Sequence, residues 1–227
     1  MGSRGKKYKK IAEKKEVKVY SLKEAIQKAK QYSYSSFKGT IELHAALKLT
    51  KDLEPKSIKG SVSLPHLESK EVKIAVFTTP ADEKKAKEAG ADMVGTEDII
   101  KEVKEGKINF DVAIATPEVM PQIAQLGKEL GPKGLMPNPK TGTVTNDIKH
   151  AINEYKKGKT NFAADNQGVI HMAVGKIDLE DEKIQENVKE ALQAIASTVG
   201  NKEINQIIRK THLAPTMGPS VQFKLEE

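Results

Sequence analysis

The two side chains best suited to acid–base chemistry share one face of a predicted strand. Glu42 and His44 lie in a stretch of alternating apolar and polar residues, so both side chains project to the same side. A carboxylate beside an imidazole can act as a general acid–base pair. Neither a nucleophile nor a second carboxylate stands in register with them, and a solvated sheet face is therefore the favoured interpretation.

The other potential metal or redox ligands are sparse. The remaining histidines, at 66, 150, 171 and 212, form no H-x-x-x-H or H-E-x-x-H pattern. The chain has no cysteine, which excludes disulfides, thiolate catalysis and cysteine-based zinc sites. We expect no metal, no cofactor and no catalysis.

A loop rich in glycine and proline spans residues 131–143. Three glycines and three prolines stiffen its backbone, and it displays Lys133 and Lys140 beside Gly131 and Gly134. One interpretation is a preformed hook for phosphates or for a facing domain. The other is a rigid connection with solvated lysines. The G-x-x-x-x-G-K-[ST] spacing of a nucleotide-binding loop does not occur in it.

A second short motif, Thr216-Met217-Gly218, lies between two predicted strands. Gly218 would let a ligand backbone approach closely, and the Thr216 hydroxyl can donate and accept. Taken alone, the motif is more typical of a simple surface turn, in which the hydroxyl would contribute little to folding.

The net charge of +7 is concentrated at one end of the chain. Residues 1–67 carry a balance of +10, residues 68–158 of −1 and residues 159–227 of −2. Seven basic residues fall within the first fifteen. Such a run attracts polyanions by counterion release, although a solvated, frayed helix remains an equal alternative.

Local patterns predict the elements that must position these residues. Ser21 and Glu24 match a capping box that opens a helix. Strands and helices then alternate from residue 72 to 157, as in a parallel α/β sheet. The expected strands are 41–49, 61–64, 72–77, 93–94, 112–115, 161–164, 169–177, 204–212 and 221–225, and the expected helices are 22–32, 80–89 (capped by Thr79), 97–104 (capped by Thr96), 117–130, 147–157 and 184–196.

The two flanks of the chain resemble each other in pattern and differ from the middle. We therefore predict an α+β two-domain protein. Residues 1–67 and 159–227 form a discontinuous domain, and residues 68–158 form an inserted Rossmann-like three-layer α/β domain. Two adjacent crossings make a hinge plausible.

Composition narrows the function classes further. No apolar run approaches the length of a membrane span, and no apolar segment follows the basic N-terminus, so we expect a cytoplasmic protein without a membrane partner. Aromatic residues make up only 4% of the chain and tryptophan is absent. Modules that stack several bases on aromatic side chains therefore fit poorly.

Several long motifs resemble those of the ribosomal protein L-one family, bacterial type. They are Ala115-Thr116-Pro117-Glu118-Val119-Met120, the continuation from Leu130 to Lys140, Gly60-Ser61-Val62-Ser63-Leu64-Pro65-His66 and Thr216-Met217-Gly218-Pro219-Ser220-Val221. The match covers nearly the whole chain in the expected order.

The resemblance implies a structural constituent of the large ribosomal subunit that forms its mobile stalk. It implies that the flank-built domain binds a bent helical region of large-subunit rRNA. It also implies help in moving deacylated tRNA out of the exit site, repression of the protein's own operon mRNA, a ribosome-bound location and a monomeric free protein. The RNA contacts it assigns are Phe37, Thr40, Glu42, His171, Gly175, Lys176, Thr216, Met217 and Gly218, with the loop of Gly131, Lys133, Gly134 and Lys140 as a secondary RNA or interdomain contact.

One position departs from the family pattern. Many bacterial members have lysine just before the phenylalanine, where this chain has Ser36. Lys38 could supply that phosphate contact from the other side. Two other functions stay open: an α/β enzyme that holds a phosphorylated substrate at the 131–142 loop, and a nonspecific nucleic-acid binder driven by the N-terminal lysines.

Overall fold

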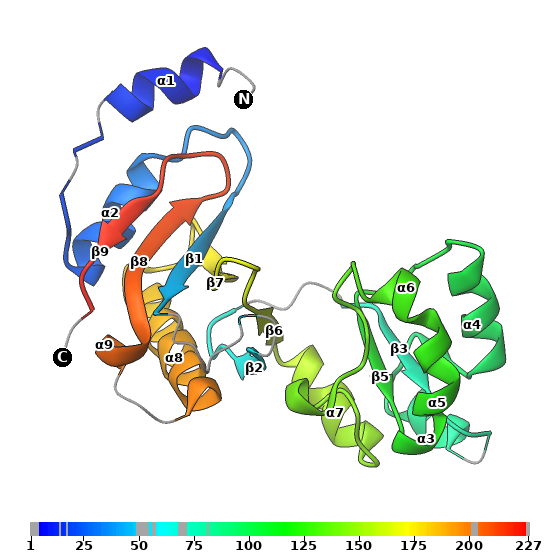
Figure 1. The fold of residues 1–227 in the computed structure, drawn as a ribbon. Helices are drawn as coiled ribbons and strands as arrows, with labels where there is room; N and C mark the ends of the chain where they lie inside the picture. The colour runs from blue at the N-terminus through cyan, green and yellow to red at the C-terminus, as the bar shows by residue number, and fades with distance from the viewer. Residues whose placement is uncertain are drawn as a thin grey trace. The chain divides into compact units, whose positions relative to one another are not determined.

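The chain has a mixed α+β fold (Figure 1). The computed structural model describes residues 5–13, 15, 16, 18–48, 55, 58–67, 72–80, 82–200 and 204–225. These residues form two compact units. The first combines residues 1–68 with 161–227, and the second spans residues 69–160.

A four-stranded antiparallel sheet organises the first unit. Its strand order is β7-β1-β8-β9, with β1 at Thr40–Leu47, β7 at Val169–Lys176, β8 at Ile208–Pro215 and β9 at Val221–Phe223. Every second residue of β1 is buried, as the alternating pattern predicts. A separate two-stranded ribbon pairs β2 (Lys59–Ser63) with β6 (Lys159–Ala163).

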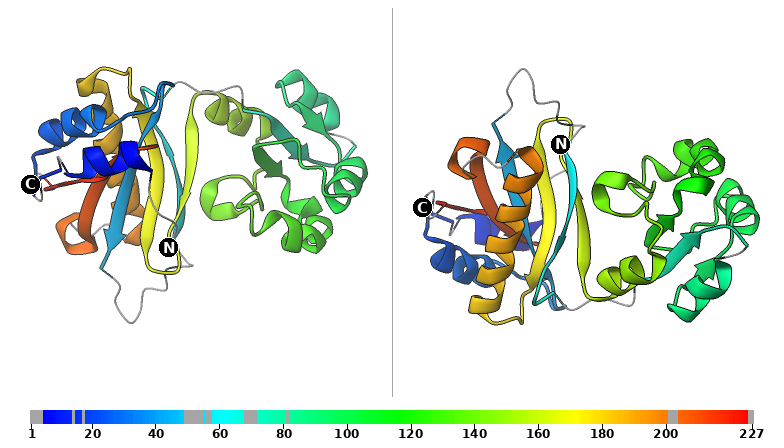
Figure 2. Two further views of the ribbon diagram at one scale, coloured as in Figure 1. Left: turned by 90° about the horizontal axis from the view of Figure 1, so that it is seen from above. Right: turned by 90° about the horizontal axis from the view of Figure 1, so that it is seen from below.

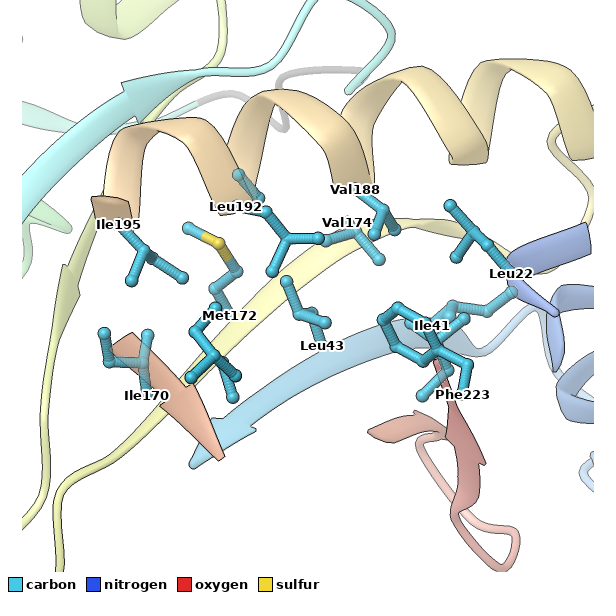
Figure 3. Packing of buried hydrophobic residues seen from close by; sticks show 14 of the residues in the cluster. Leu22, Ile41, Leu43, Ile170, Met172, Val174, Val188, Leu192, Ile195 and Phe223 are labelled. Carbon is cyan, nitrogen blue, oxygen red and sulfur yellow. The ribbon is translucent and has the colours of Figure 1, made fainter. Parts of the chain in front are cut away.

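Two helices cover one face of this sheet: α2 (Leu22–Gln31) and α8 (Asp181–Val199) (Figures 1 and 2). The predicted capping box is present, because the Ser21 Oγ accepts from the Glu24 backbone N–H while the Glu24 carboxylate accepts from that of Ser21. Figure 3 shows Val188 and Leu192 of α8 pointing toward Leu43 and Met172 of the sheet. The opposite face of the sheet carries a mixture of polar side chains and small apolar ones. Helices α1 (Lys6–Glu13) and α9 (Ile204–Ile207) complete the unit.

A β-bulge interrupts the pairing of β1 with β7. Ile41 lies opposite Gly175 and Glu42 lies opposite Ala173, so Val174 is the extra residue. Its carbonyl accepts a hydrogen bond of 2.8 Å from the side-chain amide of Asn187, which is fully buried in α8. The Asn187 Oδ1 accepts from the His66 backbone N–H at 3.1 Å. Both ends of this buried amide are thus satisfied, and it ties the bulge to the segment after β2.

The second unit is built on a three-stranded parallel sheet of order β4-β3-β5, namely Met93–Val94, Ile74–Phe77 and Val112–Ala115. On one face Ile74, Val76 and Ile114 pack with α3 (Glu83–Glu88) and α7 (Ile148–Lys156). On the other face Ala75 and Phe77 pack with α4 (Glu97–Lys104) and the segment 117–130. Strand β3 is buried at all four positions, as its uninterrupted apolar run predicts.

Four sequence predictions about helix caps and element boundaries are wrong. Helix α3 begins at Glu83 after Asp82, so Thr79 does not cap it, and Thr96 donates to the Thr78 carbonyl instead of capping α4. The segment 117–130 is a series of short turns, Pro117–Val119, Met120–Ile123, Ala124–Leu126 and Gly127–Leu130, because Pro121 lacks an N–H and Gly127 favours helix weakly.

The fourth wrong prediction concerns the start of β8. Residues 204–207 form α9, because β1 ends at Leu47, which pairs with Ile208, and an earlier strand would have no partner. The predicted strand residue Leu49 lies outside the described residues.

The buried amide gives a stability prediction. Replacing Asn187 by Leu leaves the Val174 carbonyl without its donor, and we expect a loss of about 1–3 kcal/mol in the free energy of unfolding. Chemical denaturation measures it. Gln193→Leu removes an exposed amide from the same helix and should change stability by less than about 0.5 kcal/mol. Equal stability of Asn187→Leu and the parent would show that the amide does not hold the bulge.

Candidate nucleic-acid interface

The bulge determines which side chains reach the exposed face of the sheet. Before it, His171 and Ala173 face outward; after it, Gly175 is buried and Lys176 faces outward opposite Thr40. Without the extra residue, Lys176 would point into the core. Ala46, Val169 and Lys210 face outward at the far end of these strands. The outward residues nearer the bulge, which we call the polar face, are Thr40, Glu42 and His44 of β1, His171, Ala173 and Lys176 of β7, and His212 and Ala214 of β8.

The turn between β8 and β9 is clasped to the start of β1. The Thr216 Oγ1 accepts from the Thr40 backbone N–H at 2.9 Å and lies 3.1 Å from the Thr40 carbonyl, to which it can donate. The Thr216 backbone N–H also donates to that carbonyl, at 3.0 Å. The hydroxyl therefore already has partners within the protein, and from these contacts we expect a contribution to folding that a simple surface turn would not make.

Two apolar side chains flank the clasp and face solvent. Phe37 is 56% exposed and Met217 is 45% exposed. With Val19, they are the only large hydrophobic side chains classed as exposed among the residues that the structure describes. Folding gains little from them in these positions, so they are available to a partner.

Close packing within the fold explains why glycine stands at the two glycine positions that were assigned to RNA contact. A Cβ on Gly218 would lie 2.5 Å from the Tyr32 carbonyl oxygen, and a Cβ on Gly175 would lie 3.2 Å from Leu179 and 3.3 Å from Ile184. Gly218 thus admits the end of α2, which replaces the sequence-based explanation that it admits a ligand. Contact of either backbone with RNA stays a prediction.

The lysines beside the clasp are partly engaged. Lys38, considered as a substitute for the lysine missing at Ser36, forms an ion pair of 2.7 Å with Asp178. Both side chains are well exposed, so the pair is weak and can open toward a phosphate. Ser36 itself is exposed.

Three histidines form a row across the polar face. His44 lies opposite His171 on one side and opposite His212 on the other. The Nδ1 atoms of His44 and His171 are 2.7 Å apart, and the Nε2 of His44 is 3.9 Å from a Glu42 carboxylate oxygen. Burial and then the neighbouring His171 lower the pKa of His44, and Glu42 opposes this shift.

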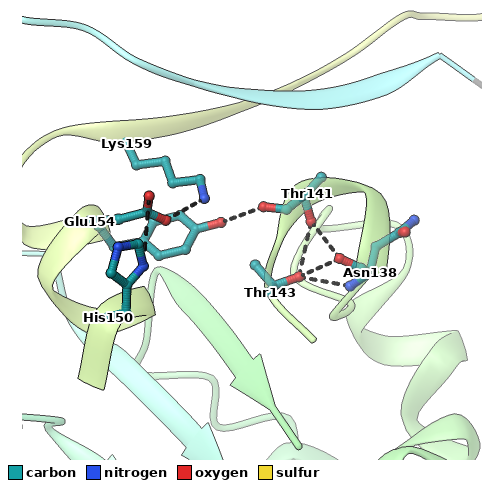
Figure 4. A network of polar contacts seen from close by, with 7 residues as sticks. Asn138, Thr141, Thr143, His150, Glu154 and Lys159 are labelled. Carbon is teal, nitrogen blue, oxygen red and sulfur yellow. Dashed lines mark hydrogen bonds and ion pairs between the residues drawn. The ribbon is translucent and has the colours of Figure 1, made fainter. Parts of the chain in front are cut away.

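The glycine- and proline-rich loop is held by its own hydroxyls (Figure 4). The Thr143 Oγ1 accepts from the Asn138 N–H at 2.7 Å and lies 2.9 Å from the Thr141 hydroxyl. Tyr155 donates to the Thr141 carbonyl at 3.3 Å. Lys133, Lys140, Gly131 and Gly134 are exposed. The internal hydrogen bonds of residues 138–143 agree with a stiff loop, and the role of the loop as a contact stays a prediction.

The described residues offer little for other chemistry. No group of three His, Asp or Glu side chains among them could hold a metal ion. No described helix is long and apolar enough to span a membrane.

Sequence reasoning missed Asn187, although a polar residue between Ile184 and Val188 on the buried stripe of α8 was the available signal.

The clasp yields a mutational prediction. Thr216→Val keeps the side-chain shape but removes both hydroxyl contacts with Thr40, and we expect a loss of about 1–2 kcal/mol in unfolding free energy. Thr216→Ser keeps the hydroxyl and should be nearer the parent. Chemical denaturation compares the three proteins, and an unchanged midpoint in Thr216→Val would rule out a stabilising clasp.

The histidine row yields a pH prediction. Burial lowers the pKa of His44 and of His212, so the unfolded chain binds more protons than the folded one. Stability should therefore fall as the pH decreases through about 6.5, the ordinary histidine value. Denaturation at about pH 7.5 and 5.5 measures this, and the double variant His44→Gln/His212→Gln should show a smaller difference. An equal difference in the variant would remove these two groups from the account.

Comparison with known proteins agrees with the motifs and the fold. A sequence model of the Ribosomal protein L1p/L10e family matches residues 7–219. The large ribosomal subunit protein uL1 of Thermosipho africanus is 44% identical over 204 residues, covering 89% of this chain and 88% of that protein. Its counterpart in Prochlorococcus marinus is 40% identical over 210 residues, covering 92% and 89%. The chain therefore belongs to the ribosomal protein L1p/L10e family, whose uL1 members are structural, non-enzymatic proteins.

Proposed function

We propose that this protein is a structural constituent of the large ribosomal subunit, bound to rRNA through the polar face and the Thr40–Thr216 clasp. The observation that carries the proposal is that Thr40, Glu42, His171 and Lys176 lie on one face of one sheet, with Thr216 of the β8–β9 turn hydrogen-bonded to Thr40. Names of relatives that are 40–44% identical support a ribosome-bound, cytoplasmic protein.

The chemistry of the polar face fits an RNA minor groove. A-form RNA presents 2′-hydroxyls and base edges in a wide, shallow groove. Short side chains on a rigid sheet can reach such a surface, and Ala173 and Ala214 leave room for it on either side of Glu42. Glu42 would be repelled by phosphate, so it should accept from a 2′-hydroxyl or a base amino group.

Bent RNA is the ligand that the polar face and the clasp favour. Phe37 and Met217 are exposed apolar side chains on either side of the clasp, and a regular duplex offers them only a hydrophilic backbone. At a kink, unstacked base faces become accessible and can pack against such side chains. The basic N-terminal residues then add affinity without sequence information.

The second unit has the character of a separate inserted domain. We infer that residues 68–158 are a Rossmann-like three-layer insertion in a domain made of residues 1–67 and 159–227, supported by the separate cores on the two faces of its parallel sheet. Two adjacent crossings suit a hinge, and the stiff 131–143 loop suits a secondary contact with RNA or with the other domain.

From family membership we also propose two further roles. A mobile stalk of this kind would help release deacylated tRNA from the exit site. Binding of an rRNA-like site in its own operon mRNA would repress translation. Both use the polar face or the hinged second unit and need no catalytic group, cofactor or partner subunit.

The two alternatives considered from sequence are less well supported. An α/β enzyme conflicts with a non-enzymatic family and with a 131–143 loop whose hydroxyls are engaged internally. A purely nonspecific binder leaves the exposed Phe37 and Met217 without a role. It differs from the proposal in one measurable respect, the preference for RNA shape.

The main test compares a kinked rRNA helix with an unkinked duplex of equal length at two salt concentrations. We expect tighter binding to the kinked RNA at both. Removing residues 1–10, which include Lys6, Lys7, Lys9 and Lys10, should weaken both affinities and flatten the salt dependence by about 0.9 per lost phosphate contact. The preference for the kink should survive. A preference lost with an unchanged slope would place specificity in the N-terminal arm.

The division into units gives a second test. Residues 1–67 joined by a short linker to 159–227 should fold and keep most RNA affinity, because the main assigned contacts all lie in these segments. Circular dichroism and the same binding assay check this. A product that is unfolded, or folded but unable to bind, would contradict the discontinuous-domain proposal.

A further inference from the structure

A second charged surface lies at the opposite end of the same sheet. It is a cavity of about 920 Å3 whose described lining residues include four cations, Lys48, Arg209, Lys210 and Lys224, and no acidic residue. We call it the basic cleft. Its other lining residues include Asn205 and Gln222, which are polar, and Val19 and Leu225, which are apolar.

The basic cleft is separate from the Thr40–Thr216 clasp. Arg209 stands near the start of β8 and Thr216 just past its end, seven residues on, which is about 24 Å in an extended strand. The antiparallel partner agrees, because Thr40 begins β1 and Lys48 follows its end. None of the contacts assigned by family resemblance lines the cleft.

The fold brings these cations together at a cost. A second bulge, between Ala46 and Leu47, leaves Arg209 as the unpaired residue beside Lys210. Thr211 pairs with Phe223, the last residue of β9, and Lys210 and Lys224 each lie one position beyond that pair. Like charges that lie close together on neighbouring strands repel one another. Lys48 donates to the Asn205 carbonyl at 2.7 Å, but no described lining residue is acidic, so the four positive charges favour an anionic ligand.

Val19 adds an independent observation. It is 49% exposed and lines the basic cleft, whereas the other two large hydrophobic side chains classed as exposed among the described residues flank the clasp. Cations surrounding an apolar side chain match a nucleic-acid strand, which presents phosphates beside sugar carbons. An acidic peptide would also supply negative charge. Unlike a nucleic-acid backbone, it has no regularly repeating oxygen atoms that could accept hydrogen bonds from the side-chain amides of Gln222 and Asn205.

We propose that the basic cleft is a second RNA-binding surface, which holds the phosphate backbone of the helix that continues beyond the kinked site. This proposal rests on the proposed function, because the ligand of the basic cleft is RNA. It differs in that the contacts of the cleft carry no preference for RNA sequence or shape. Its ammonium and guanidinium groups bind phosphate oxygens and release counterions. The two surfaces together would grip an RNA helix at points about 24 Å apart along β8.

The test uses the full chain with Arg209→Ala/Lys210→Ala, and Lys23→Ala/Lys189→Ala as the control. The control removes the same charge from α2 and α8, the helices on the other face of the sheet. Affinity is measured for a plain duplex and for kinked RNAs with short and long flanking arms, over a range of salt. Thermal melting confirms folding, and relief of like-charge repulsion should leave the melting temperature of the cleft variant unchanged or raised.

We expect the cleft variant to flatten the slope of log affinity against log salt by up to about 1.8 on the plain duplex and the long-armed RNA, at about 0.9 per contact. Short-armed kinked RNA should be bound as by the parent, and the control should be near the parent throughout. Equal losses in cleft variant and control, or no loss on the long-armed RNA, would overturn the proposal. The predicted contacts of the basic cleft do not require a kink, and the plain duplex measures them separately. Equal affinity of the parent protein for kinked RNA and plain duplex would therefore count against the proposed function alone.

Discussion

One hydrogen bond, from the buried Asn187 amide to the Val174 carbonyl, supports the bulge on which the candidate interface depends. A strand that alternates strictly would bury Lys176 when it buries Val174 two positions earlier. The extra residue resets the alternation and places Lys176 opposite Thr40 on the polar face. The same amide accepts from the backbone of His66, close to where the chain leaves the first unit. The position of the interface and the path to the second unit therefore share one buried group.

The clasp and the exposed apolar side chains build on that register. Thr216 meets Thr40 only because β1 and β8 pair from Ile41 onward, and the turn can close only because Gly218 leaves space for the Tyr32 carbonyl. Internal hydrogen bonds thus engage the Thr216 hydroxyl, one of the polar groups that sequence reasoning assigned to a ligand. What remains outward is a rigid surface of short side chains with Phe37 and Met217 at its edge, which suits recognition of shape.

The sequence predicted the mixed α+β character, the capping box at Ser21 and nearly all strands, because period-two alternation and short apolar runs report burial directly. Prediction from sequence failed where contacts with other parts of the fold determine whether a segment is helix, strand or turn. Residues 204–207 have strand-like composition but no neighbour to pair with, and the 117–130 segment breaks at Pro121 and Gly127. The candidate site was assigned by resemblance. Thr40, Glu42, His171 and Lys176 lie on one face of the sheet, whereas Gly175 is buried, and the RNA contacts themselves stay predictions. The bulges, the Asn187 link and the basic cleft could not be predicted, because each depends on which residues oppose one another across strands.

Hydrogen exchange of the backbone amides, with and without a kinked rRNA helix, tests the central claim most directly. Bound RNA should slow exchange in residues 36–42, 171–177 and 214–220, which converge at the clasp and the end of β7. The 131–143 loop should change little when the RNA contains only the kinked site. Protection confined to that loop, with the clasp unchanged, would contradict the account by placing the main RNA contact in the second unit.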